Sequence, residues 1–238
     1  ALASLDYVIL SHVNPNRAAT LKKLLDLAPH VTIICSNPGA KNLEFALPDQ
    51  PLNIQVMKGG DDEVLDLGQG HQLRFLPTPT PRYPAELLTY DPKTRILYSD
   101  KFFGAHVCGD QVFDEGWEIY QEDRQYYFDC IMAPHARQVA TALEKLEDFS
   151  NEIGVMGISS EASNQSKAST GASAIEDQAT QAKSADDWLS AIAFYAPGHG
   201  PMVRYGLAEL TSLYKQWSQK QQGQDLPVAM LYASAYGN

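Results

Sequence analysis

The order of strand-like and helix-like segments is the feature of this 238-residue sequence that most constrains its fold. Up to about residue 50, short apolar runs alternate with segments of helical spacing. From residue 53 to residue 98, strand-like segments follow one another with only turns between them, which is typical of antiparallel strands. The combination disfavours a purely parallel sheet. It predicts an α/β (α+β) fold with two sheets stacked between outer helices, an αββα sandwich.

Local signals place the elements along the chain. Asn16 can cap a helix that buries Leu21, Leu24 and Leu25, and an Asn-Pro-Gly sequence at residues 37–39 opens a second helix. An apolar run at 191–195 ends in a Pro/Gly loop. Further helical spacing covers residues 121–149 and 206–217. Strands are expected at residues 7–10, 31–35, 53–56, 63–67, 72–75, 87–90, 95–98 and 228–232.

A stretch rich in Ser, Ala and Gln covers residues 150–184 and contains few large apolar side chains. Such a composition buries too little surface to offset the entropy of ordering, so we expect a mobile insertion there. We therefore divide the chain into residues 1–222, which carry this insertion, and residues 223–238, a linker followed by a strand and a polar loop.

Composition excludes several classes of protein. A net charge of −11 without a basic stripe argues against a nucleic-acid partner. Cys35, Cys108 and Cys130 are scattered and odd in number, which suits reduced thiols in a cytoplasmic protein. No apolar run approaches the roughly 20 residues of a membrane helix, so we expect no membrane span.

Two histidines occupy loops of the kind that hold metals. His12 comes two residues after a strand, with Asn14, Asn16 and Arg17 at the next polar positions. His199 lies in the Pro-Gly-His-Gly-Pro sequence at residues 197–201. Either loop alone is more often structural, with a hydrogen-bonded histidine and an asparagine that caps a helix.

Together with three further segments, these loops resemble the flavodiiron branch of the metallo-β-lactamase superfamily. Residues 11–17 follow the frame of that family's His-x-Glu-x-Asp-His loop, and residues 80–84 follow its Thr-Pro…His-Trp-Pro segment. Residues 99–104 follow the segment in which an aspartate precedes Ala-Phe-Gly, and His199 matches the last ligand. Residues 231–238 look like the first strand and phosphate loop of the flavodoxin that follows this domain in the family.

The resemblance implies seven positions that would hold two iron ions. Only two of them keep a ligand, and the formal charge of the set changes from −3 (three carboxylates) to +3 (two Arg and one Lys). Guanidinium groups offer only hydrogen-bond donors, so we expect no metal. The seven positions are His12, Asn14, Asn16, Arg17, Arg82, Lys101 and His199.

An anion is expected in place of the metal ions. The resemblance brings Arg17, Arg82 and Lys101 together with His12 and His199, and like charges at close range need compensation. A bound chloride, phosphate or carboxylate would supply it through charge-assisted hydrogen bonds. Asp100, beside Lys101, is the best alternative within the protein.

The resemblance also implies partners and a cofactor. It is closest to the metal-ligand-deficient type of cyanobacterial diflavin protein, and the family's N-terminal β segment is missing ahead of Ala1. FMN would bind in a dimer, with its phosphate at Ser234, Tyr236, Gly237 and Asn238. The dimer would form with a second copy or with a metal-competent relative, and NAD(P)H would supply electrons through domains beyond residue 238.

Three functions are weighed on this basis. The first is a subunit of a flavodiiron oxidoreductase that passes electrons from NAD(P)H through flavin toward the reduction of oxygen to water. The second is a non-catalytic subunit that serves dimerisation or acts as a scaffold. A metal-dependent hydrolase is less favoured, because it needs an intact ligand loop to activate water.

Overall fold

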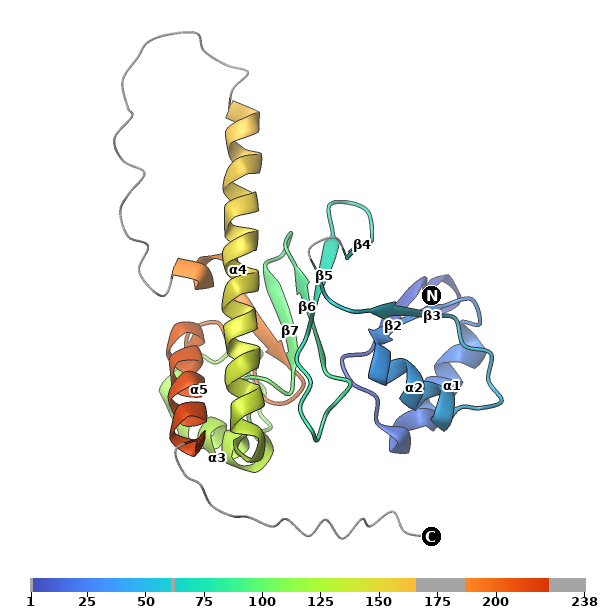
Figure 1. Ribbon diagram of the computed structural model, residues 1–238, viewed down its shortest axis with the longest axis horizontal. Coiled ribbons are helices and arrows are strands. Elements are labelled where there is room, and N and C mark those ends of the chain that lie inside the picture. The colour runs from blue at the N-terminus through green and yellow to red at the C-terminus, as the bar shows by residue number, and fades with distance from the viewer. Residues whose placement is uncertain (1, 61–62, 166–186, 223–238) are drawn as a thin grey trace.

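Two sheets form the centre of the molecule (Figure 1). The computed structural model describes the chain except for residues 1, 61–62, 166–186 and 223–238. The first sheet is parallel, in the order β1-β2-β3, and the second has the order β4-β5-β6-β7-β8. The strands are β1 (Tyr7–Ile9), β2 (Thr32–Ser36), β3 (Ile54–Met57), β4 (Val64–Asp66), β5 (Gln72–Pro77), β6 (Leu87–Asp91), β7 (Ile96–Asp100) and β8 (Phe194–Pro197).

Helices cover the outer face of each sheet, so that Figure 1 shows four layers. Two helices, α1 (Ala18–Leu27) and α2 (Asn37–Ala46), pack on the first sheet. The second sheet is covered by α3 (Gln121–Ile131), α4 (Ala136–Gln165) and α5 (Leu207–Gln222). Short 3-10 helices occur at Leu2–Ser4, Pro15–Arg17, Trp117–Tyr120, Ala133–His135 and Asp187–Ala191.

Three apolar clusters hold the layers together. Leu25 and Leu43 belong to a cluster between the first sheet and its helices. Ile34, Phe75 and Leu87 belong to a second cluster, contributed by strands of both sheets. The third and largest cluster joins the second sheet to its helices through side chains such as Leu97, Phe103, Leu143 and Tyr214. The predicted αββα sandwich is therefore confirmed.

The pairing of β7 with β8 determines where two distant loops meet. These strands are parallel, and the register shifts between Tyr98 and Asp100. The Gly198 N–H donates to the Asp100 carbonyl oxygen at 2.7 Å, and an added Cβ on Gly198 would come within 2.9 Å of the Asp100 carboxylate. The absence of a side chain at Gly198 thus lets the loop that carries His199 close against the end of β7.

Two local predictions are wrong. Asn16 does not cap α1. The side chain of Asn14 caps the preceding 3-10 turn by accepting a hydrogen bond from the Asn16 N–H at 3.0 Å. The proposed insertion also begins too early, because α4 continues to Gln165. The added turns contain Ser, Gly and Asn, which are weak helix formers, but a helix that is already nucleated can extend through them because each further residue adds one backbone hydrogen bond.

The rest of that insertion, residues 166–184, lies outside the described residues, as does the strand expected at 228–232. Among the helices that the structure describes, none combines the length and apolar character that crossing a bilayer requires.

A buried carboxylate ties the loop after β7 to α3 and α5. Asp114 is fully buried and accepts hydrogen bonds from the backbone N–H groups of Arg204, Tyr205 and Gly206, directly before α5. Its carboxylate lies 3.8 Å from the guanidinium group of Arg124, another buried side chain, which in turn donates to the Phe103 carbonyl at 2.6 Å.

Replacement of Asp114 by alanine should therefore lower the free energy of unfolding by about 3–5 kcal/mol, since it leaves Arg124 buried without its counterion. Chemical denaturation of the 238-residue chain would measure the change. Asp110→Ala is the matched control on an exposed side chain and should lie within about 0.5 kcal/mol of the parent. A loss below 1 kcal/mol for Asp114→Ala would contradict the assigned role of this ion pair.

Candidate functional site

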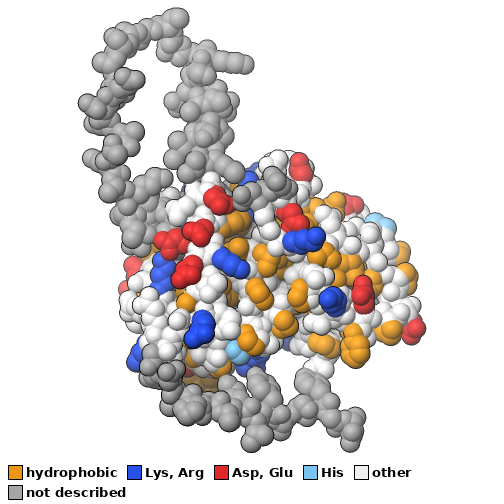
Figure 2. Space-filling view, viewed as in Figure 1, with side chains coloured by type: hydrophobic (Ala, Val, Ile, Leu, Met, Phe, Trp, Pro, Cys, Tyr) orange, Lys and Arg blue, Asp and Glu red, His pale blue; other side chains and the backbone are white. Residues whose placement is uncertain are grey.

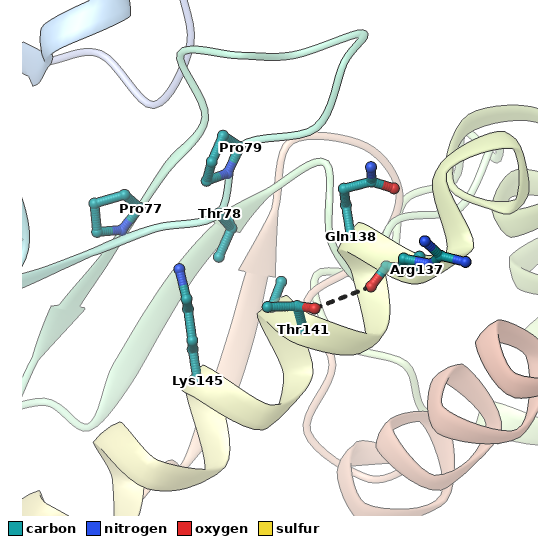
Figure 3. Close-up of a pocket in the computed structure, with 8 residues that line it drawn as sticks. Pro77, Thr78, Pro79, Arg137, Gln138, Thr141 and Lys145 are labelled. Carbon is teal, nitrogen blue, oxygen red and sulfur yellow. Dashed lines mark hydrogen bonds between the residues drawn. The ribbon is translucent and has the colours of Figure 1, made fainter.

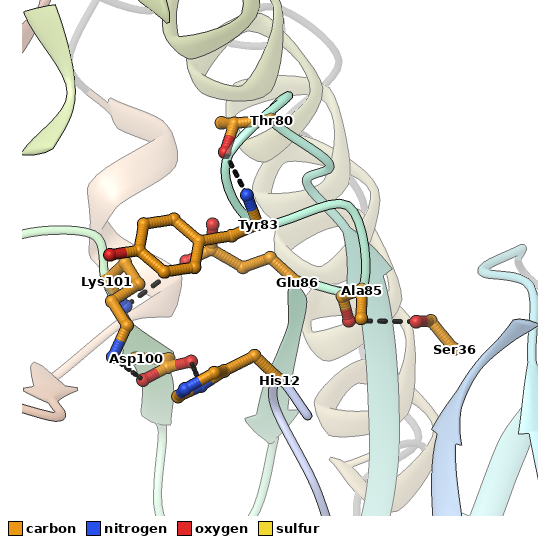
Figure 4. Close-up of polar contacts among 8 residues, drawn as sticks. All are labelled: His12, Ser36, Thr80, Tyr83, Ala85, Glu86, Asp100 and Lys101. Carbon is orange, nitrogen blue, oxygen red and sulfur yellow. Dashed lines mark hydrogen bonds and ion pairs between the residues drawn. The ribbon is translucent and has the colours of Figure 1, made fainter. Parts of the chain in front are cut away.

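The candidate site lies where four loops meet at one end of the strands (Figure 4). His12 follows β1, and Tyr83 and Glu86 precede β6. Asp100 is the last residue of β7 and Lys101 follows it, and the fourth loop follows β8. Backbone and side-chain bonds hold these loops together.

Hydrogen bonds join the loop before β6 to two segments of the first layer, the loop after β1 and the end of β2. Leu87 N–H donates to the Ser11 carbonyl at 2.8 Å, which places Glu86 beside the loop of His12. The Ser36 hydroxyl donates to the Ala85 carbonyl at 2.8 Å and also caps α2 by accepting from the Gly39 N–H. The first sheet thereby positions a loop that belongs to the second.

Asp100 is at the centre of the site. Its carboxylate lies 2.5 Å from Nδ1 of His12 and 3.2 Å from Nζ of Lys101. An ionised carboxylate can only accept, so both groups donate to it. The side chains of Asp100 and Lys101 are each 9% exposed, and that of His12 is 26% exposed, so this is a largely buried network of three charged or polar groups.

The environment keeps Asp100 ionised. Burial by itself would raise the pKa of Asp100, but the hydrogen bond and charge from His12 and the charge and hydrogen bond from Lys101 outweigh it and leave the pKa below its usual value. The negative charge that Lys101 needs therefore comes from the residue beside it in the chain.

A second carboxyl group lies next to this network. Glu86 is 1% exposed, and its Oε1 atom accepts a hydrogen bond from the Lys101 N–H at 3.2 Å. Its Oε2 atom has no partner among the described residues. Burial and then the charge of Asp100 raise the pKa of Glu86 well above its usual value, although Lys101 opposes the shift. Glu86 therefore keeps its proton to a higher pH than Asp100 does.

Tyr83 covers the network from the loop before β6. Nζ of Lys101 lies 5.6 Å from the centre of the Tyr83 ring, and the ring of His12 meets it edge-on at 6.0 Å. The guanidinium group of Arg82 lies 5.5 Å from the same ring, so two cations share one aromatic side chain.

His199 lies in the loop after β8 and is exposed. Its ring is 6.1 Å from that of His106 and 6.2 Å from that of Tyr127. Partial burial and then the charge of Lys101 lower the pKa of His199, to which His106 and Arg17 also contribute. His199 is therefore a neutral imidazole at pH 7 and above.

The structure gathers some of the predicted residues and separates others. His12, Lys101 and His199 surround Asp100, as the residue contacts and charge effects above indicate. Arg17 and Arg82 are exposed at the edge of this group, where the charge of Arg17 acts on His199 and the Arg82 guanidinium group lies over the Tyr83 ring. Asn14 and Asn16 belong to an exposed turn, and their geometry is explained by its capping bond. The residues expected to hold the FMN phosphate, Ser234, Tyr236, Gly237 and Asn238, lie outside the described part of the chain.

The carboxylate of Asp100 supplies the negative charge beside Lys101 that a bound anion was expected to supply. From the sequence, Asp100 was predicted as the alternative to a bound anion. The 3.2 Å contact shows that Lys101 has a charged partner within the protein. Glu86 was not predicted, although an acid directly before the apolar pair Leu87 and Leu88, two residues after a proline, is an unusual signal. In the described ranges, no three His, Cys, Asp or Glu side chains come together as a metal-binding group.

Comparisons with known proteins agree with this fold. The model of the ODP family of β-lactamases matches residues 1–159. Diflavin flavoprotein A 6 from Nostoc sp. is 52% identical over 237 residues, which is all of this chain and 34% of the relative. Diflavin flavoprotein A 3 from Synechocystis sp. is 56% identical over 239 residues, again all of this chain and 33% of the relative.

A solved structure gives the same result. The metal-soaked Flv1 flavodiiron core from Synechocystis sp. is 54% identical, with a TM-score of 0.74 over 94% of this chain and 46% of the solved one. The chain thus belongs to the ODP family of β-lactamase-like domains. Within that class its relatives are diflavin flavoproteins and flavodiiron cores, so the predicted resemblance is confirmed.

The buried Glu86 gives the site a pH-dependent stability. Because its pKa is raised on folding, the folded chain keeps a proton that the unfolded chain releases above about pH 4.5, and stability is lost as pH rises past that value. Glu86→Gln removes this dependence. At pH 7 it should raise the melting temperature by about 2–4 °C, which is roughly 1 kcal/mol for a domain of this size.

Circular dichroism melts at pH 7 and pH 4 would measure the effect, which should disappear at pH 4, where wild-type Glu86 is protonated in both states. Glu115→Gln, at an exposed position, should change neither melt. A variant that is less stable than the parent at pH 7 would show that Glu86 is ionised.

Proposed function

We propose that this chain is the β-lactamase-like domain of a flavodiiron oxidoreductase, in which the whole protein passes electrons from NAD(P)H through flavin toward reduction of oxygen to water. The chain spans about a third of the length of the curated relatives it matches, so the flavin and NAD(P)H steps belong to the remaining two thirds. The relatives' name, diflavin flavoprotein, supports the use of flavin.

We further propose that this domain's own pocket does not hold a pair of iron ions. The observation that carries this proposal is the network of His12, Asp100 and Lys101. Lys101 stands at the position of the family's bridging aspartate, where it brings an ammonium group instead of two ligand oxygens. Nδ1 of His12 is engaged by Asp100, and burial raises the pKa of Glu86, which disfavours the carboxylate form that would bind a metal.

The remaining positions do not restore a ligand set. Asn14 and Asn16 carry no charge, and Arg17 and Arg82 are permanent cations that cannot bind a metal. His12 and His199 are the two imidazoles left, and two neutral ligands bind a divalent ion weakly beside a lysine. A metal-dependent hydrolase is disfavoured for the same reason.

The proposed role of the chain is therefore that of an electron-transfer subunit in the cytoplasm. It would form a dimer with a second copy or with a related subunit that keeps the iron ligands, and FMN would bind at residues that include Ser234 and Asn238. A dimerisation scaffold is the alternative, and binding of FMN by the full-length protein distinguishes the two.

Iron loading tests the proposed loss of the metal site. After anaerobic incubation with ferrous iron and desalting, the 238-residue chain should retain well under one iron per chain. A five-fold variant, Asn14→Glu, Asn16→Asp, Arg17→His, Arg82→His and Lys101→Asp, restores the family's ligand set and should retain up to two. Elemental analysis gives both values, and stoichiometric iron in the unmodified chain would refute the proposal.

Flavin analysis tests the electron-transfer role. The full-length protein should purify with FMN, whereas residues 1–238 should not, since the helix that would complete a phosphate site after Asn238 is missing from them. Visible absorption after denaturation quantifies the cofactor. A full-length protein that neither contains FMN nor takes it up would favour the scaffold and contradict the oxidoreductase.

A further inference from the structure

A cavity of about 280 Å³ lies between the end of β5 and the first turns of α4 (Figure 3). Its walls are largely apolar and include Pro77, Pro79 and Ala142. The volume is at the lower end of the range for small-molecule pockets, so a ligand with a single ring or a short apolar body would fit. Nothing in the proposed oxidoreductase chemistry uses this cavity.

A buried hydroxyl group in the cavity wall has no partner. Thr78 is 1% exposed, and its side chain extends from the end of β5 toward α4 in Figure 3. Its backbone N–H donates to the Glu86 carbonyl, but its Oγ1 atom makes no hydrogen bond to the described residues. Buried polar atoms are nearly always paired, so this hydroxyl is available to a ligand.

A cation flanks the same space. The Lys145 side chain extends from α4 toward Pro77, as Figure 3 shows, and it makes no ion pair with any described residue. Arg137 and Gln138 lie at the other side, although the Arg137 guanidinium group points away from the prolines. The described residues that line the cavity include no Asp or Glu. In a chain with a net charge of −11, such a setting favours an anion.

A neighbouring cavity of about 310 Å³ helps to locate the charge. It shares Pro77 and Lys145 with the first, but Asp148 and Glu152 also line it, beside Phe149. These acids would repel an anionic group, so the group belongs in the first cavity. Figure 2 shows hydrophobic side chains gathered on this face of the molecule, with lysines and arginines scattered between them.

We propose that the cavity between β5 and α4 binds a small organic anion, a carboxylate on an apolar body. The Lys145 ammonium group and the Thr78 hydroxyl donate to the carboxylate, and the apolar body packs on Pro77, Pro79 and Ala142. Charge-assisted and neutral hydrogen bonds of this kind, inside an apolar wall, give both affinity and orientation.

Titration of the 238-residue chain with benzoate, followed by NMR at pH 7 and constant ionic strength, tests the proposal. Benzoate should shift the resonances of Thr78 and Ala142. Lys145→Met keeps the apolar stem and should weaken binding about tenfold. Thr78→Val keeps the shape and should weaken it roughly fivefold. Lys23→Met and Thr20→Val, at exposed positions of α1, are the matched controls and should bind as the parent does.

Two further ligands separate charge from apolar contact. Benzyl alcohol lacks the charge and inorganic phosphate lacks the ring, so both should bind at least tenfold more weakly than benzoate. Equal affinity for benzyl alcohol would overturn the anionic part of the proposal, and equal affinity for phosphate would overturn the apolar part. Shifts that map away from this cavity, or unchanged affinity in both Lys145→Met and Thr78→Val, would overturn it entirely. Circular dichroism melts confirm that each variant is folded.

Discussion

A lysine side chain and an aspartate side chain, adjacent in the sequence and both buried, determine how the centre of this domain is arranged. An ammonium group in a largely dry setting is stable only beside a compensating charge, and Asp100 provides it to Lys101. The same carboxylate orients His12. The carbonyl of Asp100 also receives the Gly198 N–H, so one residue joins the loops that follow β1, β7 and β8.

The layers of the sandwich make this arrangement possible. The parallel pairing of β7 with β8 puts two loops that are almost 100 residues apart at the same end of one sheet. The bond from Ser36 to Ala85 connects the first sheet to the loop before β6. Farther out, Asp114 anchors the start of α5 through three backbone N–H groups. The fold therefore holds the charged centre by hydrogen bonds that join loops of both sheets and the start of α5.

Much of the fold could be predicted from the sequence, because hydrophobic periodicity and turn residues are local signals. The alternation of strands and helices gave the two sheets and their covering helices. The length of α4 could not be predicted, since its second half contains several Gly, Ser and Asn residues, whose helix propensity is low. Asn14 rather than Asn16 is the cap because a 3-10 turn precedes α1. Residue propensities do not locate a helix start to within one turn.

The site was predictable in its positions and only partly in its contacts. The family frame located His12, Lys101 and His199, and the structure brings them around one acid. The raised pKa of Glu86 could not be predicted, because the burial that causes it arises from packing around the start of β6 rather than from a motif.

The proximity of Asp100, Lys101 and Glu86 also bears on how this centre can change over evolutionary time. A single mutation of Lys101 to aspartate would create two adjacent acids next to a third carboxyl group and would remove the ammonium group that now pairs with Asp100. That change by itself should therefore destabilise the centre unless a neighbouring charge changes with it. Substitutions at Asp100, Lys101 and Glu86 are therefore coupled, because the charge that one position tolerates depends on the other two.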